Sequence, residues 1–189
     1  AHLAIVDIVL GVADILPIRG FGYLVPRNAT NNSDEILGVI FDSDAVPNQS
    51  QRLTKLTVMM GGPYWRHRSS FPNEDDVKER ALRALHSQLG LSLLTLTSHL
   101  ENIYARVMTD TIPQYLVGHP QRMAELKAAI KMHPQWRNRL SLLGYSYGGV
   151  GVNDCIANAM DTCDAICNYE QNRSPLSDIS GLQPALFPG

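Results

Sequence analysis

Residue types that often carry chemistry are scattered along this sequence. Its six histidines are widely spaced, and the nearest two, His86 and His99, lie 13 positions apart. No histidine is at metal-ligand spacing from a cysteine. Cys163 and Cys167 are four residues apart and would share a helix face, where they could bind a metal, but the packing of two buried thiols is the favoured interpretation. The sequence therefore predicts no metal site.

The common sequence motifs of enzymes are also absent. No serine-hydrolase elbow, zinc-peptidase motif or phosphate-binding loop occurs in the 189 residues. Residues 65–68 (Trp-Arg-His-Arg) form a small basic and aromatic cluster that could contact an anion, and a solvated loop is the favoured alternative.

The most informative segment runs over residues 144–156. Glycines at positions 148, 149 and 151 would let a ligand ring approach the backbone without interference from a Cβ atom. A helix that begins there would direct free N–H groups at a carbonyl or a developing anion. The residues alone leave two interpretations open, a site for an anion or polarised ring and a plain turn before a helix.

The composition excludes several classes of protein. A net charge of −2 and 44% hydrophobic residues are typical of a globular chain, and the lack of a long basic run argues against nucleic-acid binding. Charged residues make up 18%, below the roughly 25% of soluble domains, which predicts surface buried against another molecule or segment. Three cysteines, an odd number, favour a reducing compartment. The apolar stretch 3–16 is too short for a membrane span and contains Asp7 and Asp14.

Hydrophobic periodicity and turn residues predict a mixture of strands and helices. Residues 3–10 are rich in β-branched side chains and predict a strand buried on both faces. Further strands are expected at 21–26, 37–42, 56–60, 102–108 and 139–143, with 27–35 as an exposed hairpin connection. Three helices are expected, one from the cap Asn73 to Gly90, one from Pro120 to residue 133, and one at 152–168. The buried stripes would be Val77, Ala81, Ala84 and Leu85 in the first helix and Met123, Leu126 and Ile130 in the second.

Six blocks of the sequence resemble one known family. They are residues 18–26, 37–43, 57–62, 112–115, 118–119 and 144–156. In order and spacing they are similar to the C-terminal half of the eukaryotic protoporphyrinogen oxidases, with the fungal mitochondrial type most similar. The resemblance covers roughly residues 3–167.

The resemblance implies a flavoenzyme of haem biosynthesis. Such enzymes hold FAD noncovalently and oxidise protoporphyrinogen IX to protoporphyrin IX, with molecular oxygen as electron acceptor and hydrogen peroxide as product. The resemblance also implies a peripheral location at the mitochondrial inner membrane. The implied fold is of the amine-oxidase type and of class α+β, with a sheet-based substrate domain, flanking helices, and the final strand, turn and helix of a Rossmann-like FAD domain. Residues 1–138 would belong to the substrate domain, residues 139–168 to the FAD domain, and residues 169–189 to a mobile tail.

The family blocks also imply site residues. Phe21, Gly22, Leu24, Met59 and Ile112 match positions that contact the substrate. Val150, Gly151 and Val152 match the segment whose backbone meets the flavin, where the helix N-terminus would stabilise negative charge on the reduced ring. The contacts are apolar or through backbone atoms, which suits a flat macrocycle, and no side chain is identified as a required acid or base. A bulky residue in place of Gly22 is expected to reduce turnover more than stability.

The sequence also departs from the family. It contains no GxGxxG turn, which enzymes of this class need for the dinucleotide. The resemblance implies that this turn and the membrane-docking region lie upstream of Ala1, so that the N-terminal half of the enzyme would be a partner of this chain and the isolated chain would be inactive. Met108 stands where the family often has an aromatic residue or histidine. The alternatives are a truncated, non-catalytic homologue that binds a porphyrin or a partner protein, and a related oxidase with another substrate.

Overall fold

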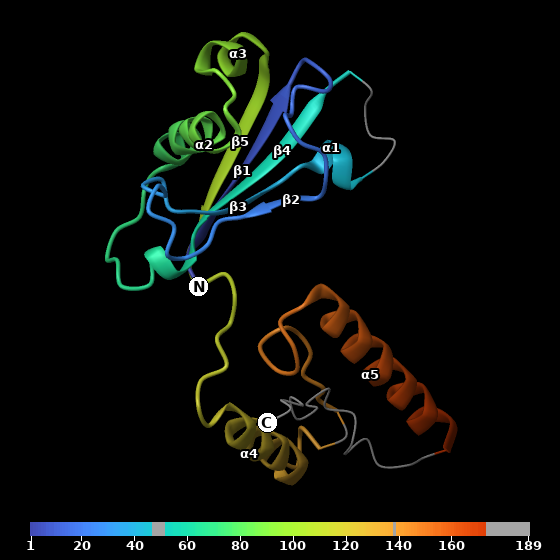
Figure 1. Ribbon diagram of the computed structural model, residues 1–189. Helices are drawn as coiled ribbons and strands as arrows, with labels where there is room; N and C mark the ends of the chain where they lie inside the picture. Colours follow the sequence, from blue (N-terminus) through green and yellow to red (C-terminus); the bar gives the residue numbers. More distant parts are fainter. Residues whose placement is uncertain (47–51, 138, 173–189) are drawn as a thin grey trace. The chain divides into compact units, whose positions relative to one another are not determined.

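The computed structural model describes residues 1–46, 52–137 and 139–172 (Figure 1). The chain divides into two compact units, Ala1–Thr111 and Ile112–Gly189. The class is α+β, as the sequence predicts. The sequence predicts that a substrate-binding part ends at residue 138 and a flavin-binding part begins at residue 139. This boundary depends on which ligand each part binds, so it stays a prediction.

The first unit is built on one antiparallel sheet of five strands. Along the chain these are β1 (Leu3–Leu10), β2 (Gly22–Leu24), β3 (Ile36–Ile40), β4 (Thr54–Gly61) and β5 (Leu100–Met108). Their order in the sheet is β2-β3-β4-β1-β5 (Figure 1). All five occupy segments where the sequence predicts strands, with ends that differ by a few residues.

Only one face of the sheet is fully buried. Along β1, Ala4, Val6, Ile8 and Leu10 are buried, whereas Asp7 is exposed and its neighbours on the same side are half-buried. The prediction that this strand is buried on both faces is therefore wrong. The β-branched Ile5 and Val9 supply the apolar pattern, but they lie beside Asp7 on a face where a polar side chain is tolerated.

Helix α2 (Glu74–Leu89) packs on the buried face, against β1 and β5. The Asn73 side chain accepts a hydrogen bond from the Asp76 amide, the Asp76 carboxylate accepts one from the Asn73 amide, and Gly90 ends the helix at φ 72°. This confirms both predicted helix ends and explains them as a capping box and a left-handed C-cap. The predicted stripe Val77, Ala81, Ala84 and Leu85 is buried.

Three short helices have no counterpart in the prediction. They are α1 (Asp42–Ala45), the 3₁₀ turn η1 (Gly62–Tyr64) and α3 (Leu93–Ser98). Each is shorter than two turns, so its residues cannot show the helical periodicity that a sequence analysis detects.

The second unit contains α4 (His119–Met132) and α5 (Val152–Asn172). Ile130 is buried in α4, and Met123 and Leu126 are half-buried. The predicted strand at 139–143 is wrong, because residues 139–143 are irregular. A strand needs a neighbour for its backbone groups, and the described part of this unit contains none, so a Rossmann-type arrangement is not formed here. Helix α5 continues to Asn172, four residues into the predicted tail, and residues 173–189 lie outside the described residues.

Among the described residues, no helix is long and apolar enough to cross a bilayer.

Candidate functional site

The open face of the sheet, opposite the face that α2 covers, carries two rows of residues across the strands. Strand register places Leu24, Gly38, Met59, Ile5 and Arg106 in one row, and Gly22, Ile40, Thr57, Asp7 and Tyr104 in the next. Neighbours within such a row have Cβ atoms about 5 Å apart. Because successive residues point to opposite sides of a strand, the buried Val58 and Met60 fix Thr57 and Met59 on this open face.

The open face brings together three of the five predicted substrate residues. Gly22 and Leu24 lie on β2, and Met59 lies two strands away on β4, in the row of Leu24. Met59 is half-buried and Leu24 is 80% exposed. The register thus assembles an apolar wall from segments far apart in the sequence.

The structure does not place the other two predicted substrate residues in these rows. Phe21 precedes β2, is 71% exposed, and its carbonyl accepts a hydrogen bond from the Phe41 amide. Because successive residues of a strand point to opposite sides, Phe21 and Tyr23 share the side that Gly22 does not. The Tyr23 hydroxyl donates to Gln88 of α2 on that other side of the sheet. Ile112 is exposed at the start of the second unit.

A polar centre lies among the apolar residues of the open face. The Thr57 hydroxyl oxygen is 2.9 Å from a carboxylate oxygen of Asp7 and 2.9 Å from one of Asp42. Burial of the half-buried Asp42 holds the pKa of its carboxyl above the ordinary value, against the lowering effect of Thr57. This centre was not predicted from the sequence, in which its one signal is an aspartate inside the β-branched run 3–10.

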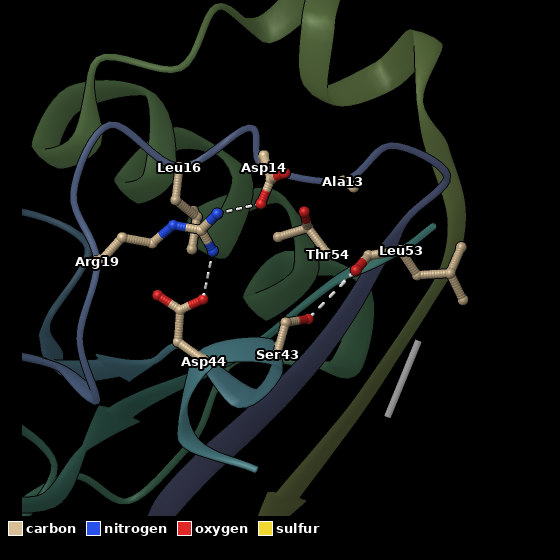
Figure 2. Close-up of a pocket in the computed structure, with 8 residues that line it drawn as sticks. All are labelled: Ala13, Asp14, Leu16, Arg19, Ser43, Asp44, Leu53 and Thr54. Carbon is tan, nitrogen blue, oxygen red and sulfur yellow. Dashed lines mark hydrogen bonds and ion pairs between the residues drawn. The ribbon is translucent and has the colours of Figure 1, made fainter. Parts of the chain in front are cut away.

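A polar cavity of about 350 Å³ lies beside the segment that leads into β2 (Figure 2). In it, the Arg19 guanidinium pairs with Asp14 and, at 2.7 Å, with Asp44 of α1. The Asp44 carboxylate also accepts a hydrogen bond from the Gly20 amide at 3.1 Å. The Gly20 amide and the Arg19 guanidinium together lower the pKa of Asp44. The contacts fasten residues 19 and 20 and so position the start of β2. The lining residues are Ala13, Asp14, Leu16, Arg19, Ser43, Asp44, Leu53 and Thr54.

The basic and aromatic cluster at 65–68 is part of the fold. Trp65 is fully buried, and its indole N–H donates to Glu35 at 2.9 Å. The same carboxylate pairs with Arg68 and, at 3.1 Å, with Arg80 of α2. The expected solvated loop is therefore wrong for Trp65, whereas Arg68 is exposed and its anionic partner is a carboxylate of this chain.

In the second unit, three of the family blocks contact one another. The Tyr115 hydroxyl donates to the Tyr145 carbonyl at 2.6 Å and accepts from the Gly149 amide at 2.8 Å. The His119 ring stacks on Tyr115 at 4.0 Å, and its Nε2 lies 3.1 Å from the Ser146 carbonyl. The glycine-rich loop is thus held in one conformation by the segment 115–119.

The predicted flavin segment presents apolar side chains and an occupied amide. Val150 and Val152 are exposed, the latter to 76%, and would suit the edge of an apolar ring. The Gly151 amide already donates to Asp154 at 3.1 Å. A carboxylate at a helix N-terminus offsets the positive end of the helix dipole, so it opposes the expected stabilisation of negative charge there. The residues fit ring contact better than anion binding.

Cys163 and Cys167 of α5 are exposed, so the predicted packing of two buried thiols is wrong. Asn158 and Thr162 occupy the buried positions of this helix instead. In the described residues, no group of three or more His, Cys, Asp or Glu side chains could hold a metal ion.

Comparisons with known proteins give one consistent family. No protein-family profile matches the chain. Protoporphyrinogen oxidase from Schizosaccharomyces pombe is 37% identical over 164 residues, which cover 85% of this chain and 31% of the relative. The human protoporphyrinogen oxidase is 33% identical, and the match covers 83% of this chain and 32% of the human protein.

Comparison of the fold with solved structures points to the same family. A solved structure from Exiguobacterium sp. 255-15, provisionally named a protoporphyrinogen oxidase, superposes with a TM-score of 0.64 at 25% identity. The match covers 87% of this chain and 34% of the solved one, so the chain spans about a third of the length of its relatives. The resemblance predicted from the sequence blocks is therefore confirmed: over more than four fifths of its length, this chain corresponds to about a third of a protoporphyrinogen oxidase.

Proposed function

We propose that this chain forms part of an FAD-dependent enzyme that oxidises protoporphyrinogen IX to protoporphyrin IX with molecular oxygen as electron acceptor. The observation that carries the proposal is the register of the sheet, which brings Gly22, Leu24 and Met59 onto one open face. The names of the relatives supply the substrate. A location on the mitochondrial inner membrane, as a peripheral protein, belongs to the same proposal.

The open face suits a flat, apolar macrocycle. Leu24 and Met59 offer apolar side chains on this face. A planar ring system gains from such a surface because the whole of one ring face can be removed from water. The chain's own residues would bind and orient the substrate in this way.

FAD, when bound, would supply the acceptor for electrons from the substrate. Val150, Gly151 and Val152 are the residues of this chain proposed to contact it. Tyr115 and Asn158 would hold that loop in place, since Asn158 donates to the Gly148 carbonyl at 3.4 Å and Tyr115 contacts Gly149.

The proposal includes a protein partner, the remainder of such an enzyme. The relatives are about three times longer than the matched region. Val152, Ile156 and Met160 recur every four residues along one side of α5, and all three are exposed. An exposed apolar stripe of this kind fits burial against another part of an enzyme.

The test is a titration of the chain with protoporphyrin IX, followed by porphyrin absorbance and fluorescence. Leu24→Glu places a charge on the open face at a side chain that is 80% exposed, and Leu94→Glu makes the same change on α3 at one that is 78% exposed. We expect Leu24→Glu to weaken binding about tenfold or more, because a carboxylate facing an apolar ring must lose water, and Leu94→Glu to leave binding unchanged. Equal binding by both variants would remove the open face as the substrate site.

A second measurement separates the enzyme from the alternative. Equilibrium dialysis with FAD, with and without the upstream two thirds of the S. pombe relative, tests flavin binding. Flavin retained only with that partner would support the oxidase. Porphyrin binding with no flavin retained under either condition would favour the non-catalytic porphyrin-binding homologue.

A further inference from the structure

Three residues from three elements meet on the open face of the sheet. Asp7 comes from β1, Thr57 from β4 and Asp42 from α1 at the end of β3 (Figure 1). The threonine hydroxyl oxygen is 2.9 Å from both carboxylates, so it lies at hydrogen-bond distance between them.

The hydrogens of this arrangement do not match two ionised carboxylates. A threonine hydroxyl has one hydrogen to donate, and an ionised carboxylate can only accept. If both aspartates were ionised, one carboxylate oxygen would face the lone pairs of the threonine oxygen with no hydrogen between them. Both contacts at 2.9 Å are full hydrogen bonds only if the arrangement holds a second hydrogen.

We propose that Asp7 and Asp42 hold one proton between them through Thr57, and that this chain of three side chains exchanges a proton with the molecule bound on the open face. In the favoured arrangement the Asp42 carboxyl donates to the Thr57 oxygen, and the Thr57 hydroxyl donates to an ionised Asp7. Asp42 is the better site for the proton because it is half-buried, whereas Asp7 is exposed.

Among the described residues, few charged and titratable groups surround Asp42. The Asp7 charge favours the protonated form of Asp42, and the Lys55 charge on β4 opposes it. Asp44, two positions along α1, is paired with Arg19. Tyr104 lies across from Asp7 on β5. Burial, with help from Asp7, outweighs the Thr57 hydrogen bond, a backbone hydrogen bond and the Lys55 charge, because the pKa of Asp42 lies above the ordinary value.

The role in proton exchange rests on the proposed function. Thr57 and Asp7 stand in the same row as Gly22, next to the row of Leu24 and Met59. Oxidation of a porphyrinogen removes protons as well as electrons. The step assigned here is a proton transfer without oxidation: an N–H or C–H bond of the substrate breaks, its electron pair stays on the substrate, an O–H bond forms on Asp7, and the exposed Asp7 later releases that proton to water.

The shared proton is tested by NMR titration of the full chain with ¹³C-labelled aspartate carboxyls. We expect Asp7→Asn to shift the Asp42 titration to lower pH, because the asparagine amide can donate to the Thr57 oxygen while Thr57 donates to an ionised Asp42. In a Thr57→Val background the same Asp7→Asn change should shift Asp42 less. Asp75→Asn, on the exposed start of α2, is the matched control and should leave Asp42 unchanged. An Asp42 titration that does not respond to Asp7→Asn, or that responds equally in the Thr57→Val background, would overturn the proposal.

The exchange role is tested by repeating the titration with protoporphyrin IX. A shift of the Asp7 and Asp42 signals on porphyrin binding supports the role. Porphyrin binding, seen by absorbance, with unchanged carboxyl titrations would reject the role while the proposed function stands. No porphyrin binding would reject the proposed function and the role with it, and the response of Asp42 to Asp7→Asn with and without Thr57 would still decide the shared proton.

Discussion

The Gly149 amide donates a hydrogen bond to the Tyr115 hydroxyl at 2.8 Å, across 34 positions of the sequence. The same hydroxyl donates to Tyr145, so one side chain satisfies backbone groups at both sides of the glycine-rich loop. The glycines allow the loop many backbone conformations, and the two hydrogen bonds of Tyr115 hold it in one of them.

Tyr115→Phe should loosen this loop, because it leaves the Gly149 amide and the Tyr145 carbonyl without their protein partner. We expect hydrogen exchange of the Gly149 amide to speed up about tenfold, which corresponds to about 1.4 kcal/mol. Tyr145→Phe is the control, since it removes a hydroxyl from the same loop and keeps the Tyr145 carbonyl. Equal exchange rates in both variants would show that the Tyr115 contacts do not hold the loop.

Gly22→Ala should destabilise the first unit more than Gly20→Ala. Both glycines have positive φ, 144° and 147°, so alanine is strained at either position. A Cβ at Gly22 would also lie 2.1 Å from the Val39 carbonyl oxygen, whereas one at Gly20 meets no atom within 4 Å. We expect a loss of about 1 kcal/mol at Gly20 and about 3 kcal/mol or more at Gly22 in urea unfolding. This geometry conflicts with the expectation that substitution of Gly22 would reduce turnover more than stability. Similar losses of unfolding free energy in Gly20→Ala and Gly22→Ala would support that expectation again.

Glu35→Gln should lower the free energy of unfolding of the first unit by about 3 kcal/mol. The Glu35 side chain is 14% exposed and is shared by Arg68 and Arg80, so removal of its charge leaves two arginines without their partner. Chemical unfolding measures the loss. Glu79→Gln is the control, because Glu79 is exposed and lies 3.8 Å from Arg83, and it should change stability by less than about 0.5 kcal/mol.

Tyr23 should make the unfolding free energy depend on alkaline pH. Burial raises the pKa of Tyr23 to about 12, whereas the unfolded chain should show the ordinary value of 10.0. The folded state then binds the proton more tightly, so this contribution is complete below the unfolded pKa and is lost as pH rises toward the folded pKa. Urea midpoints of wild type and Tyr23→Phe should converge as the pH approaches about 12. The exposed Tyr104→Phe should leave the slope of wild type unchanged, and parallel curves for wild type and Tyr23→Phe would disprove the assignment.

The elements predicted well from sequence are those with local signals. Asn73, the acidic first turn and Gly90 mark α2 because capping involves neighbours in sequence. The strands follow from β-branched runs. The predicted strand at 139–143 failed because pairing depends on a partner that a local pattern does not contain.

The site was predictable in part for the same reason. Family blocks identify Gly22, Leu24 and Met59, but only the register shows that they share a face. The contacts of Thr57 with Asp7 and Asp42 join positions 50 and 15 residues away, and no local pattern predicts such pairs. Tyr115 went unnoticed because its partners are backbone atoms of a distant loop.

The order of strands has a consequence for synthesis of the protein. β1 leaves the ribosome before the other four strands of the sheet, yet its two neighbours, β4 and β5, begin at Thr54 and Leu100. Until about a hundred further residues have been translated, this apolar strand has one edge unpaired, and before β4 emerges it has both. Unpaired strand edges promote aggregation, so a nascent chain of this protein should depend on chaperones that bind extended apolar segments.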